Sequence, residues 1–327
     1  MGFRIYDTVY LGKAHPSGGG GGYSPICFRE FDVDATMELI PSKTTSRIIN
    51  INGANNIADY ALYCAYYENT NISGDVNFSS LKKLSHMNSC YYTFYRCTGI
   101  TNADMQNIIE IAGQNACNGM FRESGITGYD LTSLNKISGS QACAHMFEST
   151  PNLTKAFLDN VTTISGVSAC NRMFADSAIT FFSMANLQQI SSSNACVEMC
   201  AGCKFLVVVN LPALHTISVG SSCKHWFTKC ISLETVTFTL LKNIGVGKIF
   251  ESAFANDTAL TDLYFPALYS GSFGTYQDQF TNMLDGCNNV TVHFPSNLQT
   301  IISTWADYTA GFGSATTTVA FDLPATS

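Results

Sequence analysis

The cysteines are the residues of this sequence best suited to chemistry, because thiolates bind zinc and carry out redox reactions. Three of the 13 cysteines lie close together, as Cys196-x3-Cys200-x2-Cys203. A CxxC pair of this kind is typical of zinc sites and of thiol–disulfide catalysts. The alternative is structural, because a reduced cysteine is also a small apolar side chain that is often buried.

The spacing of the cysteines favours the structural interpretation. Six of them recur at intervals of 26 or 27 residues: Cys90, Cys117, Cys143, Cys170, Cys196 and Cys223. Each begins a phrase such as Cys117-Asn-Gly-Met-Phe121. In the phrase that begins at Cys196, Cys200 takes the place of the final Phe. Cys203 takes a second recurrent position, which Cys97, Cys230 and Cys287 fill elsewhere. We therefore predict buried, reduced cysteines and no metal or cofactor.

Other chemical motifs are weak. Gly18–Gly22 could suggest a phosphate-binding loop, but the Lys-Ser/Thr of a P-loop is missing. The six histidines are scattered, and no Ser/His/Asp or paired-carboxylate arrangement is evident. The sequons at Asn152, Asn160 and Asn289 are explained by turn residues and do not imply glycosylation. The sequence predicts a protein that is not an enzyme.

The composition excludes several classes of partner. The 327 residues are 46% hydrophobic and only 13% charged, with a net charge of −7 and no basic stripe, which argues against nucleic-acid binding. No stretch approaches the roughly 18 to 20 apolar residues of a membrane helix, so we expect no membrane insertion. Met1–Asp7 lacks the pattern of a secretory signal, and we expect no signal peptide.

The fixed period predicts a repeat solenoid of about nine coils of 26–27 residues. After the cysteine phrase, apolar residues recur at relative positions 0, 3 and 5, as in Leu153/Ala156/Leu158 and Ile179/Phe182/Met184. Further apolar residues follow at steps of three, and then a stretch rich in Ser, Gly and Asn. We predict a short helical or 3₁₀ turn at the cysteine phrase, one short strand and a turn, with the strands forming a parallel β-sheet face.

The repeat resembles the BspA-like family of leucine-rich repeats. The resemblance is carried by Phe227-Thr-Lys-Cys-Ile-Ser-Leu233, by Leu284-Asp-Gly-Cys-Asn-Asn-Val290, and by Leu211-Pro, Phe265-Pro and Phe294-Pro. It covers about three quarters of the chain. It implies a leucine-rich-repeat solenoid and says little about the partner.

The two ends differ from the repeat. Residues 1–58 are predicted to form a small β-rich docking or capping module, and residues 59–304 the solenoid. Residues 305–327 are predicted to form a C-terminal cap, preceded by a short amphipathic helix at Phe294–Trp305 and including a strand at Thr316–Pro324.

The C-terminal segment contains His293-Phe-Pro-Ser-Asn-Leu298 and ends with Val319-Ala-Phe-Asp-Leu-Pro-Ala-Thr326. With these two stretches it resembles repeat proteins of gut bacteriophages and bacteria. The resemblance implies a non-enzymatic virion protein of the tail or fibre type, assembled in the host cytoplasm and acting extracellularly. Its partners would be a host surface protein or glycan and, through the N-terminal module, other virion proteins; it is also a possible homo-oligomer. The alternatives are a BspA-like bacterial surface adhesin and an intracellular protein-interaction scaffold.

The candidate binding residues follow from alternation along the predicted strands. If positions 3 and 5 point inward, positions 2 and 4 point outward. The outward set contains an apolar cluster beside a lysine, and we take as candidate site residues Lys155, Phe157, Phe181, Val208 and Tyr264. Exposed apolar clusters often mark interaction sites. The alternative is that they pack under the N-terminal module or a neighbouring subunit, or serve lateral stacking.

Overall fold

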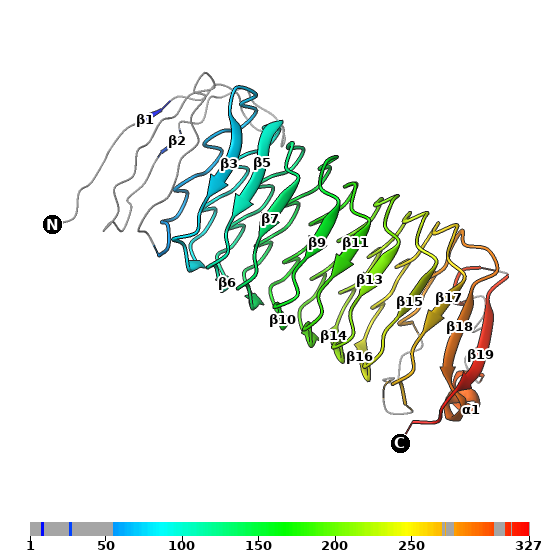
Figure 1. The fold of residues 1–327 in the computed structure, drawn as a ribbon. Coiled ribbons are helices and arrows are strands. Elements are labelled where there is room, and N and C mark those ends of the chain that lie inside the picture. The colour runs from blue at the N-terminus through cyan, green and yellow to red at the C-terminus, as the bar shows by residue number, and fades with distance from the viewer. Residues whose placement is uncertain are drawn as a thin grey trace, which may run out of the picture.

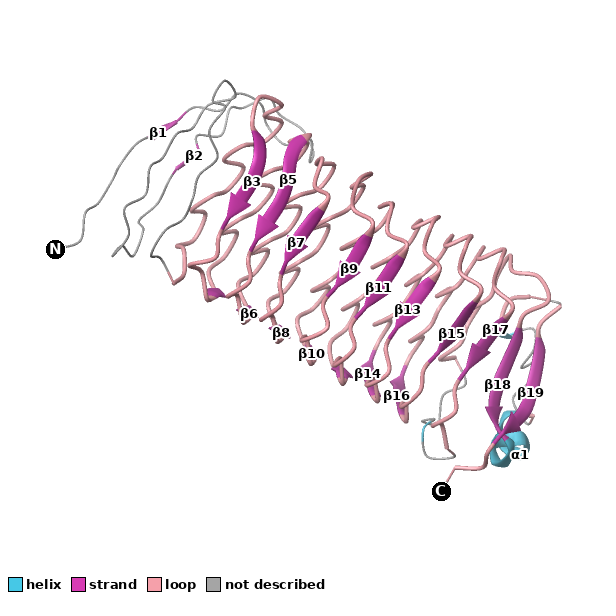
Figure 2. Ribbon diagram, viewed as in Figure 1, coloured by secondary structure: helices cyan, strands magenta, loops and turns pink. Residues whose placement is uncertain are grey.

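The computed structural model describes residues 8–9, 26–27, 55–269, 272, 278–303, 311–314 and 316–326. In the repeat region the chain forms a parallel β-solenoid of about nine coils (Figure 1). The predicted repeat solenoid is therefore confirmed. Each coil passes along three sides, which we name the first strand face, the second strand face and the turn face. Figure 2 shows that the described chain is built almost entirely of strands and loops.

The first strand face carries the strands predicted from positions 3 and 5. Its strands pair in parallel within three consecutive groups, and the partners are one repeat apart, as for Ala156, Phe182 and Val209. Along the chain they are β3 (Ser73–Asn77), β5 (Gly99–Asp104), β7 (Gly128–Asp130), β9 (Lys155–Phe157), β11 (Phe181–Ser183), β13 (Val208–Asn210), β15 (Thr235–Thr237), β17 (Asp262–Tyr264), β18 (Thr291–Pro295) and β19 (Thr318–Leu323).

The second strand face is a seven-stranded parallel sheet that the sequence pattern did not predict. It is formed by the apolar residues at steps of three, because Ile137, Ile164 and Ile190 pair in register and point inward. Its strands are β4 (Lys83–Leu84), β6 (Glu110–Ile111), β8 (Lys136–Ile137), β10 (Thr163–Ile164), β12 (Gln189–Ile190), β14 (Thr216–Val219) and β16 (Asn243–Val246). The coils that carry β3 to β15 therefore each contribute to two sheets where one was expected.

The turn face contains the cysteine phrases, and the helical or 3₁₀ turn predicted there is wrong. The backbone N–H of Cys117 donates to the carbonyl of Ala142 in the next coil (2.7 Å), whereas that of Met120 donates to the carbonyl of Cys117 (3.1 Å). Every fourth residue, such as Gly119 and Glu123, has a positive φ, which interrupts any helix. The turn face is thus a ladder of turns that is hydrogen-bonded from coil to coil.

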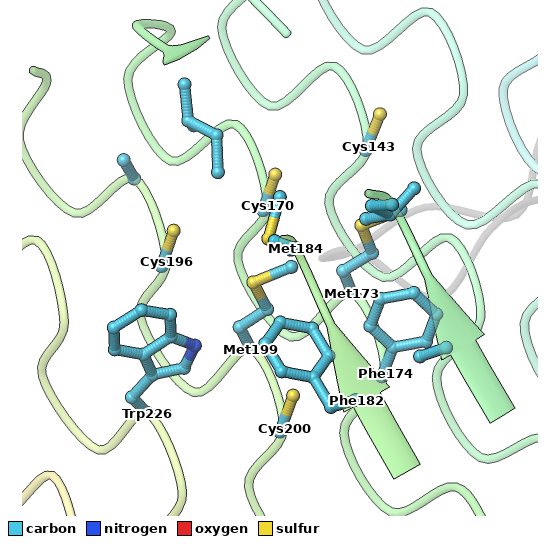
Figure 3. Close-up of a cluster of buried hydrophobic side chains, with 14 of the residues drawn as sticks. Cys143, Cys170, Met173, Phe174, Phe182, Met184, Cys196, Met199, Cys200 and Trp226 are labelled. Carbon is cyan, nitrogen blue, oxygen red and sulfur yellow. The ribbon is translucent and has the colours of Figure 1, made fainter. Parts of the chain in front are cut away.

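Identical positions of successive coils stack to form one continuous core. Positions 0, 3 and 5 of the fourth repeat, Leu153, Ala156 and Leu158, are all buried, as predicted. The phenyl rings of the cysteine phrases stack almost parallel: Phe94, Phe121, Phe147 and Phe174, with centroids 5.4, 5.6 and 5.4 Å apart. Figure 3 shows the cysteine column beside the methionines and rings, with Cys143, Cys170 and Cys196 on successive coils.

The predicted C-terminal elements are present in part. A 3₁₀ turn at Ser296–Leu298 leads into α1 (Gln299–Ile302), within the predicted helix, and the predicted final strand is β19. Trp305 lies outside the described residues, as do the Gly18–Gly22 loop and most of the predicted module at residues 1–58. From that module the structure describes β1 (Thr8–Val9), which pairs antiparallel with β2 (Ile26–Cys27), and residues 55–58. Across the described ranges, no helix is long and apolar enough to span a membrane.

Candidate functional site

Four of the five predicted site residues lie together on the first strand face. Phe181 of β11 is in register with Lys155 of β9 on one side and with Val208 of β13 on the other. Phe157, two residues after Lys155, points outward on the same strand. The fifth residue, Tyr264 of β17, lies beyond β15 and is not part of this cluster.

The side chains of the cluster are accessible to solvent. Phe157 is 45% exposed and Val208 is 43% exposed, whereas Phe181 is half-buried and the intervening Ala156 and Phe182 are fully buried. The alternation predicted from the sequence therefore holds from Lys155 to Phe157 and at Phe181 and Phe182. The rings of Phe157 and Phe181 are in contact, with centroids 5.2 Å apart and planes tilted by 45°. Two aromatic side chains on adjacent strands thus form one exposed surface.

Neighbouring residues fix the backbone beneath these rings. The hydroxyl of Tyr129 donates a hydrogen bond to the carbonyl of Phe157 (3.3 Å). Ser183, which is in register with Phe157, was predicted to point outward but is buried, because its hydroxyl donates to the carboxylate of Asp159. The amide of Asn210 donates in turn to the Ser183 hydroxyl (2.9 Å). Ser183, the residue next to Phe157 on the adjacent strand, is therefore held in a hydrogen-bond network with Asp159 and Asn210.

The loop before β13 adds apolar residues that the strand pattern missed. Phe205 is 62% exposed and Val207 is 50% exposed. The sequence signal was present in the apolar run Phe205–Val209, of which only Leu206 is buried, while Val209 is partly buried against the core. We use the term apolar surface for the set Phe157, Phe181, Phe205, Val207 and Val208. Clusters of exposed apolar side chains beside a charged residue such as Lys155 are characteristic of interaction surfaces.

Tyr264 belongs to a separate polar cluster that links three strands. Its ring stacks on the imidazole of His293 in β18, with centroids 4.2 Å apart. The Nε2 of His293 lies 3.0 Å from Asp262 of β17, and its Nδ1 lies 2.9 Å from Asp322 of β19. Partial burial lowers the pKa of His293, and the hydrogen bonds to both aspartates raise it. The effect of the aspartates is the larger, so the pKa lies above its ordinary value.

We expect this cluster to make the stability of the C-terminal strands depend on pH. Because the pKa of His293 is raised in the folded protein, its stabilising effect is complete below the unfolded pKa of about 6.5 and is lost as pH rises through the folded value. We expect wild-type protein to lose roughly 1 kcal/mol of stability across this window, the scale of a partly exposed ion pair. Urea unfolding between pH 5.5 and 9 measures the change, which should be absent in His293→Gln. An equal slope in the variant would assign the pH dependence to other groups.

The cysteine cluster occupies positions of the core. The thiol of Cys203 donates to the backbone carbonyl of Phe174 in the preceding coil (3.1 Å). In the same way, the thiol of Cys230 donates to the backbone carbonyl of Cys200 (3.2 Å). Burial raises the pKa of Cys200 well above its ordinary value, so the thiol is protonated. In the part of the chain that the structure describes, no three His, Cys, Asp or Glu side chains are arranged to bind a metal ion.

The turn face carries an ion-pair network centred on Glu148, whose side chain is only 4% exposed. Its carboxylate accepts hydrogen bonds from Arg172 (2.7 Å) and His145 (2.6 Å) and forms an ion pair with Arg122 (3.0 Å). The three partners come from three successive coils. Burial raises the pKa of Glu148, but the hydrogen bonds from His145 and Arg172 outweigh it, and the net pKa is lowered. The sequence could not show this network, because Arg122 and Arg172 are 26 and 24 residues from Glu148 along the chain. Every charge is compensated, which is typical of a structural network.

The chain was compared with protein-family models and with curated proteins, and neither comparison found a match. The repeat pattern and the geometry described above are therefore the basis on which a function is assigned.

Proposed function

We propose that this protein is a non-enzymatic recognition protein that binds a host surface through its solenoid. The observation that carries the proposal is the apolar surface, in which Phe157, Phe181 and Val208 lie on three adjacent strands with Lys155 beside them. Binding energy at protein interfaces is concentrated in a few central aromatic and arginine side chains within a polar rim. The pair of phenyl rings supplies such a centre, and the backbone beneath it is held by hydrogen bonds.

We further propose that the solenoid is a leucine-rich repeat of the BspA-like type. Support comes from the recurrent cysteine phrase and from the thiols of Cys203 and Cys230, which occupy equivalent hydrogen-bonded positions in successive coils. A repeat with a conserved interior and variable outward residues suits recognition, because the exposed positions change without disturbing the stacking.

The proposed setting is a virion, in which the protein is a tail or fibre component. Support comes from the resemblance of the C-terminal segment to repeat proteins of gut bacteriophages, and from an elongated body of about nine coils (Figure 1). Strands stacked at about 4.8 Å give such a body a length of roughly 40 Å. In this setting residues 1–58 would attach the protein to other virion proteins, and the apolar surface would contact the host.

The double variant Phe157→Ser with Phe181→Ser tests the recognition surface. We expect binding to fall at least tenfold, because two aromatic anchors are typically worth more than about 2 kcal/mol together. The melting temperature should change little, because Phe157 is 45% exposed. Fluorescently labelled protein incubated with a panel of gut bacterial cells, read by flow cytometry, measures the binding.

The matched control is Val167→Ser with Leu240→Ser, which removes two exposed apolar side chains (50% and 47% exposed) outside the first strand face. The control should bind like the wild type. Unchanged binding of the phenylalanine double variant, or a large fall in its melting temperature, would contradict the assignment. Binding to animal epithelial cells in place of bacterial cells would favour a bacterial adhesin over a virion protein.

A further inference from the structure

A groove of about 420 Å³ runs along the turn face over the later coils. Its floor is a column of repeat-equivalent residues with small side chains: Ala201, Thr228 and Ala255. Two further columns form its walls: Arg172, Glu198, His225 and Ser252 on one side, and Asp176, Gly202, Lys229 and Asn256 on the other. Asp285 lies at its C-terminal end. The groove follows the solenoid axis and crosses the direction of the chain in each coil.

The groove exists because the floor positions change size along the solenoid. In earlier coils the equivalent positions hold Tyr67, Tyr95, Arg122 and Glu148, and then Ala175, which is fully buried and does not line the groove. The rings of Tyr67 and Tyr95 pack with centroids 4.7 Å apart and fill this space. The stacking therefore accommodates large side chains in the column, and the small residues of the later coils are not required by the backbone. Their consequence is an open channel.

The walls present donors and acceptors of both signs. Arg172 is engaged by Glu148 and Asp176, whereas the exposed Lys229 makes no ion pair with any described residue. The Nδ1 of His225 lies 3.3 Å from the hydroxyl of Thr228 on the floor. Gly202 keeps its wall low: a Cβ there would lie 2.2 Å from Oδ1 of Asp176, and its φ of +73° suits glycine.

These features select a ligand class. Besides His225, the lining carries three carboxylates and two cations, so a strongly charged ligand of either sign would meet like charges. Hydroxyl groups both donate and accept hydrogen bonds, and they match a wall that offers both. The methyl groups of Ala201 and Ala255 offer contacts to C–H groups. The volume lies within the range of about 300–1,000 Å³ that is usual for small-molecule sites.

We propose that this groove binds a short neutral oligosaccharide that lies along the solenoid axis. Sugar hydroxyls contact the polar walls, and the C–H groups of the sugar rings rest on the alanine floor. Lys229 and Asn256 reach the ligand from one wall, and His225 reaches it from the other. This site is on a different face from the apolar surface and does not depend on it.

Thr228→Tyr tests the proposal by filling the centre of the groove. The variant should fold, because the equivalent position of an earlier coil is Tyr95. The probe is a printed array that carries neutral, sialylated and sulfated oligosaccharides. We expect wild-type protein to bind neutral oligosaccharides and Thr228→Tyr to bind them at least tenfold more weakly. The matched control is Thr162→Tyr, at a half-buried threonine that also bonds to a carbonyl of an adjacent coil.

Lys229→Ala provides a test that adds no bulk, with Lys242→Ala as its control at another exposed lysine. It should weaken binding of neutral oligosaccharides at least threefold without changing the melting temperature. The proposal is overturned if wild-type protein binds no neutral oligosaccharide, if it binds only charged ones, or if Thr228→Tyr binds as well as the wild type. The variant Phe157→Ser with Phe181→Ser should keep oligosaccharide binding. The groove and the apolar surface are therefore tested independently, and either proposal can be contradicted without the other.

Discussion

Replacing Phe147 by alanine is expected to lower the free energy of unfolding by about 3–5 kcal/mol, the usual cost of removing a buried aromatic side chain. The ring is fully buried between those of Phe121 and Phe174, at 5.6 and 5.4 Å, and a third ring, Tyr129, stacks on it at 4.5 Å. The coil-to-coil hydrogen bonds on either side hold the backbone spacing, so the cavity left by the ring cannot close.

Urea unfolding followed by circular dichroism measures this loss. Leu240→Ala, which truncates a side chain that is 47% exposed, is the control and should cost less than about 1 kcal/mol. A loss below about 1 kcal/mol for Phe147→Ala would show that the ring column does not support the solenoid.

Native protein is expected to resist thiol reagents, with labelling of the buried cysteines at least about 1,000-fold slower than in the unfolded chain. Of the twelve cysteines whose side chains the structure describes, Cys64 is half-buried and the others are buried, and all twelve are free thiols. Burial raises the pKa of Cys97 and Cys203 to about 12, so at pH 8 only about one thiol in 10,000 is ionised.

Mass spectrometry after timed maleimide labelling measures this protection. Unfolding in guanidinium should expose all 13 cysteines. A Cys64→Ala variant separates the half-buried thiol from the rest and should lose only the earliest modification. Rapid labelling of Cys117, Cys143 or Cys170 in native protein would contradict the stacking register.

The core could be predicted from the sequence because burial constrains every coil in the same way. Ala156 and Phe182 occupy the same position in adjacent coils, and both point into the core. Because this position faces the core from coil to coil, apolar residues recur there along the sequence. The second strand face was missed because steps of three, as from Leu158 to Val161 and Ile164, look like turns of a helix. Its pairing depends on hydrogen bonds between residues about 27 apart, which no local pattern reveals.

The two candidate sites also differ in whether a local sequence pattern reveals them. Exposure of Phe157 and Phe181 follows from alternation along a strand, so the sequence pointed to the apolar surface directly. The burial of Ser183 did not follow from alternation, because it depends on a hydrogen bond to Asp159 in the preceding coil. The groove was not visible, because it is defined by what Ala201 and Ala255 lack relative to Tyr67 and Tyr95.

The parallel register also determines how the protein bears mechanical load. The backbone hydrogen bonds between coils join residues roughly one repeat apart, so no such bond ties the first coils to the last. We therefore expect tension applied to the two ends of the chain to act on the terminal coils, which would peel away one at a time while the interior stays intact. Each released coil lengthens the chain by up to about 90 Å, since an extended residue spans at most about 3.3–3.6 Å. The solenoid is in this sense a stepwise extensible tether.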